Sequence, residues 1–210
     1  MKLNKVLALA LSGVMAVSML AGCSGNGSNN GGSNSGEEQG NTNAVVEAVM
    51  NAQDGNDVVV DFSYSTDLET KLGNAINMVG VNATQATVEN QLATILGKGD
   101  VYYSAMYGNV SNKSTEVGTQ TAVNVYKISG NMIESAALKQ AAEEVNSGLS
   151  QLTDKSNTYN DQYGNVGVLC NEYTYAGDTA MVTATTLDGE IIYYVAYVVT
   201  CTSTRTLVEA

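Results

Sequence analysis

Apolar and polar positions divide the chain into three stretches. Residues 6–20 form an uncharged apolar run, residues 24–43 contain no apolar side chain, and residues 44–210 show the apolar spacings of helices and strands. The third stretch has the length of one domain. The pattern therefore predicts a single globular domain over residues 44–210.

Apolar spacings of three and four residues predict the helices of this domain. Residues 66–69, Thr-Asp-Leu-Glu, match a capping box, so a helix is expected to start at Thr66. Gly97 suits the left-handed position after a helix that starts near Asn82 or Thr84. The remaining predicted elements are helices over 44–53 and 132–152, the longest, and strands over 58–64, 101–107 and 120–128.

Two turn signals bracket three strand-like runs in the C-terminal third. Asp188-Gly189 is a strong two-residue hairpin turn, and Gly177-Asp178 is a weaker one. With a two-residue loop, Ala184 would face Tyr193 on the apolar side of the sheet. We therefore expect an α+β fold, with a mainly antiparallel sheet, helices packed on one face and a C-terminal three-stranded meander.

The N-terminal stretch has the features of an export signal. Lys2 and Lys5 precede the apolar run, which is shorter than the ~20 residues of a membrane-spanning helix. The residues that follow, Leu20-Ala21-Gly22-Cys23, resemble the lipobox of bacterial lipoproteins. The resemblance implies that residues 1–22 are a signal peptide cleaved before Cys23, whose thiol and new amino group carry fatty acyl chains such as palmitate. The alternative is an ordinary secretory signal that ends near a cysteine.

Residues 24–43 are expected to be a disordered tether. They are Gly, Ser, Asn and other polar residues, which have no apolar surface to offset the entropy of ordering. A coil of about twenty residues spans roughly 25 Å on average and about 65 Å when taut. With lipidated Cys23, this tract (23–43) would hold the domain outside the cytoplasm, anchored by lipid to the bacterial cell membrane.

The charge of the chain excludes some partners. The net charge is -12, and loss of Lys2 and Lys5 would leave seven basic residues against twenty-one acidic ones, a net charge of -14. Such a surface repels phosphate backbones and anionic headgroups, so we expect no nucleic-acid partner and no polybasic membrane contact.

Cys170 and Cys201 are the two thiols outside the lipobox. Exported proteins usually join such thiols, but the expected meander separates these two by two strands and about 30 Å, far beyond the ~7 Å reach of a disulfide. We expect them to be unbonded. A bridge would require a different strand order.

Catalytic and cofactor motifs are almost absent from the sequence. The chain has no histidine, which removes His-dependent triads and the usual zinc sites, and it has no phosphate-binding glycine motif, so no cofactor or metal is expected. Asp54-Gly55-Asn56-Asp57 lacks the spacing of a calcium loop, and a turn between helix and strand is the favoured interpretation.

Tyrosine is the remaining positive feature, with twelve tyrosines against one Phe and no Trp. An exposed set made of Tyr102, Tyr126 and Tyr194 beside Thr183 and Asn124 would suit a peptide or glycan surface. The alternative is that tyrosine simply favours strands and tolerates half-buried positions.

These observations predict a lipid-anchored binding or interaction module of the bacterial cell envelope that is not an enzyme. Its partner would be a peptide, a glycan or an envelope protein. A hydrolase that uses two carboxylates and a structural envelope subunit are the alternatives.

Overall fold

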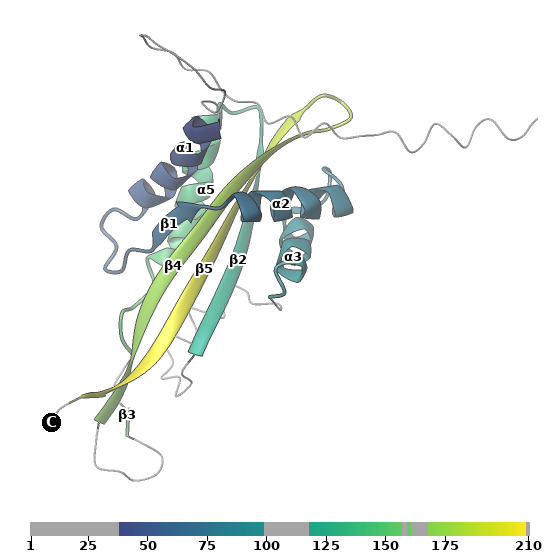
Figure 1. The fold of residues 1–210 in the computed structure, drawn as a ribbon. Coiled ribbons are helices and arrows are strands. Elements are labelled where there is room, and N and C mark those ends of the chain that lie inside the picture. The colour runs from purple at the N-terminus through teal and green to yellow at the C-terminus, as the bar shows by residue number, and fades with distance from the viewer. Residues whose placement is uncertain (1–37, 99–117, 157–158, 161–167, 209–210) are drawn as a thin grey trace, which may run out of the picture.

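A mixed, mostly antiparallel sheet is the centre of the computed structural model, which describes residues 38–98, 118–156, 159–160 and 168–208 (Figure 1). The strands run in the order β1-β4-β5-β2, and β3 also pairs with β4. Among the described strands, only β1 and β4 pair in parallel. The strands are β1 (Asp61–Tyr64), β2 (Gly118–Ser129), β3 (Tyr159–Asn160), β4 (Val168–Thr185) and β5 (Ile191–Val208). The predicted α+β class with a mainly antiparallel sheet is confirmed.

Helices cover both faces of this sheet. The four described helices are α1 (Glu38–Ala52), α2 (Thr66–Val79), α3 (Gln85–Ile95) and α5 (Glu134–Leu149). On β5, Tyr197 belongs to the core beneath α1 and α5, whereas its neighbour Val198 belongs to the core beneath α2 and α3. The prediction of helices on one face is therefore wrong. Residues 192–199 form an uninterrupted buried apolar run, which is the pattern of a strand covered on both sides.

The hairpin between β4 and β5 has a longer loop than the sequence predicts. Thr186 N donates to Glu190 O at 2.9 Å, and Gly189, at φ 83°, donates to Thr186 O at 3.0 Å. The loop is thus three residues, Leu187 to Gly189, which is the common form that ends in a left-handed glycine. One extra residue shifts the register, so Ala184 lies opposite Ile192 instead of Tyr193.

The predicted turn at Gly177-Asp178 is also wrong, because β4 continues through it as one strand of eighteen residues. A Cβ atom on Gly177 would lie 2.4 Å from the Phe62 ring, so the glycine leaves room for that ring on β1. The three-stranded meander is consequently not exact. β4 and β5 form one long hairpin, and β3 contributes only two residues beside β4.

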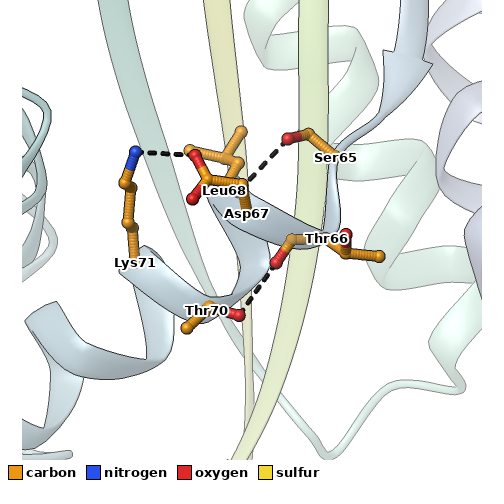
Figure 2. A network of polar contacts seen from close by, with 6 residues as sticks. All are labelled: Ser65, Thr66, Asp67, Leu68, Thr70 and Lys71. Carbon is orange, nitrogen blue, oxygen red and sulfur yellow. Dashed lines mark hydrogen bonds and ion pairs between the residues drawn. The ribbon is translucent and has the colours of Figure 1, made fainter.

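The predicted second and third helices are confirmed, and α2 starts at Thr66 as expected. Ser65, not Thr66, is the N-cap of α2, and its Oγ accepts from Leu68 N at 3.2 Å (Figure 2). In the same turn Lys71 pairs with Asp67 at 2.6 Å. Thr84 caps α3 by accepting from Thr87 N.

Helix α1 starts earlier than the apolar pattern indicates. Its first residues, 38–43, belong to the tract that the composition assigns to the tether. At its other end the Gln53 side chain is buried and exchanges two hydrogen bonds with the Val60 backbone, at 2.8 and 3.0 Å. These bonds tie the end of α1 to the start of β1.

Candidate functional site

The residues predicted to form a tyrosine surface do not share one face of the sheet. Asn124 and Tyr126 on β2 and Thr183 on β4 lie on the face of α1 and α5, since they stand opposite Tyr197, Val195 and Tyr193. Tyr194 points to the opposite face. Tyr102 and Cys23 lie outside the described residues. The register shift explains the difference, because it places Tyr193, not Tyr194, opposite Thr183.

Tyr194 is a buried anchor for the connection between α2 and α3. Its hydroxyl donates to Val81 O at 2.8 Å, and burial raises the pKa of Tyr194 to about 12, so the hydroxyl stays protonated. Lys127 Nζ lies 5.8 Å from the Tyr194 ring centroid and donates to Ala83 O at 2.7 Å and Val81 O at 3.2 Å. Both side chains therefore hold the helix pair against the sheet.

Tyr126 belongs to an aromatic row under α1 and α5. Its ring packs edge-on against Tyr197, with centroids 6.0 Å apart, and Tyr197 packs in the same way against Phe62 at 5.7 Å. The Tyr197 hydroxyl is buried and finds no hydrogen-bond partner in the described part of the chain. The row fits the alternative interpretation, in which strand tyrosines fill the core.

Helix α3 covers the backbone of β2 with two side chains. Val125 N donates to Glu89 Oε2 at 3.0 Å, and Lys127 N donates to Gln85 Oε1 at 3.2 Å. Four residues along a helix advance about 6 Å and two residues along a strand about 6.6 Å, so the two repeats match. Burial raises the pKa of Glu89, and the bond from Val125 N opposes this shift. The pair satisfies backbone donors that a bare strand edge would expose.

The charges of carboxylates on two helices act on Tyr126 at this edge. The negative charges of Glu144 on α5 and Glu89 on α3 both raise the pKa of Tyr126, after the larger effect of burial. Gln140 Nε2 donates to Glu144 Oε1 at 3.0 Å. We call Gln85, Glu89, Tyr126, Lys127 and Glu144 the β2-edge cluster.

The β2-edge cluster is the strongest candidate site in the described residues. Its carboxylates and phenol offer acceptors and donors for amide or hydroxyl groups, and a carboxyl of raised pKa can transfer a proton. Sequence reasoning missed Gln85, Glu89 and Glu144. Polar residues at such spacings are ordinary on a helix surface, and only the packing of α3 and α5 beside β2 brings them together.

Cys170 and Cys201 are both free and buried. They lie on neighbouring strands, not two strands apart: Cys201 stands opposite Tyr175, five residues along β4 from Cys170. That offset is about 17 Å, and it also directs the two thiols to opposite faces. Burial raises the pKa of Cys201, whose thiol shares a hydrogen bond with the Tyr175 hydroxyl. A protonated thiol is a poor nucleophile.

The acidic turn after α1 is built from backbone and amide bonds. Asn56 N donates to Gln53 O at 3.0 Å, and Asn56 Nδ2 donates to Asn146 Oδ1 on α5 at 2.8 Å. Across the described ranges, no group of three or more Cys, Asp or Glu side chains is arranged to hold a metal ion. The turn between helix and strand agrees with the interpretation favoured by its sequence.

Comparisons with models of protein families, with curated proteins and with solved structures found no significant match. None of the described helices is long and apolar enough to cross a bilayer.

Proposed function

We propose that this protein is a lipid-anchored, outward-facing binding or interaction module of the bacterial cell envelope. The observation that carries the proposal is the order of segments at the N-terminus. A basic head, an apolar run, Leu20-Ala21-Gly22-Cys23 and a polar tract follow one another directly. This order suits a thiol that holds lipid and a linker that separates the domain from the membrane.

The polar contacts of the domain favour interaction over catalysis. Three reactive side chains of the domain make hydrogen bonds that hold the fold together. Glu89 accepts from Val125 N, Lys127 donates to two carbonyls, and the Cys201 thiol is hydrogen-bonded to the Tyr175 hydroxyl. Histidine, the commonest general acid and base, is absent from the chain. Glu89, Lys127 and Cys201 thus already serve the fold, and this favours a binding role over a catalytic one.

Lipidation is tested by expressing the full chain in a bacterium and analysing its amino terminus by mass spectrometry. The expected mature protein begins at acylated Cys23 and partitions with membranes. A Cys23→Ser variant should lose the acyl mass and leave the membrane fraction. An uncleaved chain that starts at Met1 and stays in the cytosol would contradict the proposal.

Binding is tested by retention of the purified protein on cell-wall fragments and secreted peptides. Glu144→Gln, in the β2-edge cluster, should reduce retention, whereas Glu143→Gln changes an exposed neighbour and serves as the matched control. Equal retention of both variants would place the contact elsewhere on the domain. No retention of the unmodified protein by any fraction would count against a binding role.

A hydrolase that uses two carboxylates is the second candidate. The observation in its favour is that Glu89 and Glu144 both act on Tyr126, and the pKa of Glu89 is raised. The same variants separate the candidates. Turnover of a glycan by the unmodified protein that Glu144→Gln abolishes, while Glu143→Gln preserves it, would identify a hydrolase. Retention without turnover identifies a binding module.

A further inference from the structure

Exposed large apolar side chains gather at one end of the sheet. Seven are exposed in the described residues, and four of them belong to two neighbouring connections: Met132 and Ile133 between β2 and α5, and Leu187 and Ile191 at the β4–β5 turn. We call these four residues the apolar end. Leu187 is 96% exposed and Ile133 is 75% exposed.

Backbone contacts place the two connections side by side. Gly130 N donates to Ile191 O at 2.7 Å, and Ser129 stands opposite Ile192 at the last pair of β2 and β5. A Cβ atom on Gly130 would lie 2.5 Å from Ile191 Cβ, so the strands approach as closely as a glycine allows. The four apolar side chains therefore belong to one end of the molecule.

The described structure also begins at this end. Helices α1 and α5 run side by side in the same direction, because the turn after α1 meets Asn146 in the second half of α5. Since α5 starts beside the β4–β5 turn, α1 starts there too (Figure 1). The polar tract thus joins the domain at the end that carries the exposed apolar residues.

The length of that tract sets which part of the domain stays near its anchor. Fourteen residues separate Cys23 from Glu38. As the flexible coil that its composition predicts, this segment spans about 20 Å on average and about 50 Å when taut. The opposite end of β5, near Leu207, lies about 50 Å from Ile191 along the strand. At its average span, the segment therefore keeps the apolar end closer to the anchored lipid than the end near Leu207.

We propose that the apolar end contacts the lipid surface, with Leu187 and Ile133 inserted among the headgroups and first acyl carbons. This inference rests on the proposed lipid anchor. A few side chains give only weak affinity alone, but a short tether keeps the domain at millimolar effective concentration near the bilayer, where weak contacts are occupied. The contact orients the domain with its long axis away from the membrane and the C-terminal ends of α3 and α5 toward solvent.

The contact is apolar and not electrostatic. Glu134, Asp188 and Glu190 flank the exposed apolar residues, so anionic headgroups would oppose the contact and neutral headgroups would favour it. Added salt should leave binding to neutral vesicles unchanged and should strengthen binding to anionic ones, because it screens the repulsion.

Tryptophan fluorescence tests this orientation without background, because the chain contains no Trp. The protein used lacks residues 1–22 and therefore keeps every described element. Its Cys23 thiol is coupled to a maleimide lipid in vesicles of neutral phosphatidylcholine, whose acyl chains are brominated. Cys170 and Cys201 are buried, so they should react more slowly than Cys23. Leu187→Trp is compared with Leu207→Trp, an exposed residue at the opposite end of the hairpin. Circular dichroism checks that both variants fold.

The expected result is a blue shift and at least twofold quenching of the Leu187→Trp emission, with less than a tenth of the Leu207→Trp emission lost. Ile133→Trp should behave like Leu187→Trp. Equal quenching at both ends, or none at either, would overturn the proposal. A blue shift of Leu187→Trp that needs no vesicles and grows with protein concentration would also overturn it, in favour of self-association.

Chemical coupling keeps this test separate from that of the lipid anchor. If mass spectrometry finds no acylation but Leu187→Trp is quenched, the proposed anchoring fails and the apolar surface stands. If Cys23 is acylated and neither Trp is quenched, the anchor stands and the surface contact fails.

Discussion

The two faces of the sheet are held to their helices in different ways. The face under α1 and α5 carries large side chains, among them Tyr197, Tyr126 and Phe62 in an edge-to-face row. The face under α2 and α3 includes small ones, Ala180 and Ala196, beside the large ring of Tyr194, and adds polar bonds at its margin. One layer depends on the fit of rings, and the other depends on bonds from side chains to backbone.

The difference shows how one long strand serves two cores. Successive residues of β5 alternate between the two cores, with Tyr197 beneath α1 and α5 and Ala196 beneath α2 and α3. Small side chains bury less area against the helices. Hydrogen bonds add attachment that is specific in direction: Tyr194 and Lys127 donate to backbone carbonyls, while Glu89 and Gln85 accept from backbone N–H groups of β2.

The largest loss of stability is expected from adding a side chain at Gly177, where the Phe62 ring packs against the backbone of β4. Gly177→Val places methyl groups where the Phe62 ring lies, and we expect unfolding free energy to fall by about 3 kcal/mol, measured by urea denaturation. Ala176→Val, at the exposed neighbouring position, is the control. Phe62→Ala should restore part of the loss in the double variant, and the absence of any rescue would show that the ring is not the cause.

A matched pair of hydroxyl deletions compares the two faces directly. Tyr194→Phe removes the bond to Val81 O and should cost about 1.5 kcal/mol, whereas Tyr197→Phe removes a buried hydroxyl that has no partner in the described residues and should cost nothing or stabilise slightly. Thermal unfolding of both variants measures the difference. Equal losses would mean that the polar bond adds nothing to the attachment of α2 and α3.

The start of α2 provides a smaller test on the polar face. Ser65→Ala removes the acceptor for Leu68 N and should cost about 1 kcal/mol, and Thr66→Ala should have a much smaller effect (Figure 2). Urea denaturation distinguishes the two positions. A larger loss for Thr66→Ala would restore the capping box that the sequence predicts.

The smallest effect is expected from Glu89, which accepts a hydrogen bond from the β2 backbone, and this effect depends on pH. Burial raises the folded-state pKa of Glu89 above its unfolded value, so its contribution to stability is complete below about pH 4.5 and is lost as pH rises through the folded pKa. Glu89→Gln keeps an acceptor for Val125 N and removes the charge. We expect the variant to have a flatter profile of stability against pH in thermal melts, with Glu143→Gln unchanged from the parent. A steeper fall with pH in Glu89→Gln would contradict the assigned cause.

Local patterns predict helices well where residues close together in the chain decide the geometry. The stripe of Leu68, Leu72 and Ile76 marks α2, and Gly97 marks the end of α3 with φ 64°. Gly177 was misleading because a glycine that admits a neighbouring ring has the same sequence signature as one that turns the chain. The sequence locates the hairpin loop at Asp188-Gly189 correctly but predicts it one residue too short. That error places Thr183 on the same face as Tyr194, whereas Thr183 lies opposite Tyr193.

The candidate site was much less accessible to sequence reasoning. Of the predicted set, Asn124 and Tyr126 lie at the β2 edge, while Tyr194 is committed to the α2–α3 core. Glu89 and Glu144 are 55 positions apart in the chain and carry no motif. Their common effect on Tyr126 depends on which helix packs beside which strand.

By itself the sequence determined the order of apolar run and polar tract, the α+β class and the left-handed glycine that follows α3, because these depend on local composition and on contacts within a few residues. Tertiary structure alone decided the strand order, the covering of both faces, the parallel pairing of β1 and the grouping of polar side chains at β2. These features are set by burial summed over distant segments, and the apolar side chains of a strand do not specify which neighbour will cover them.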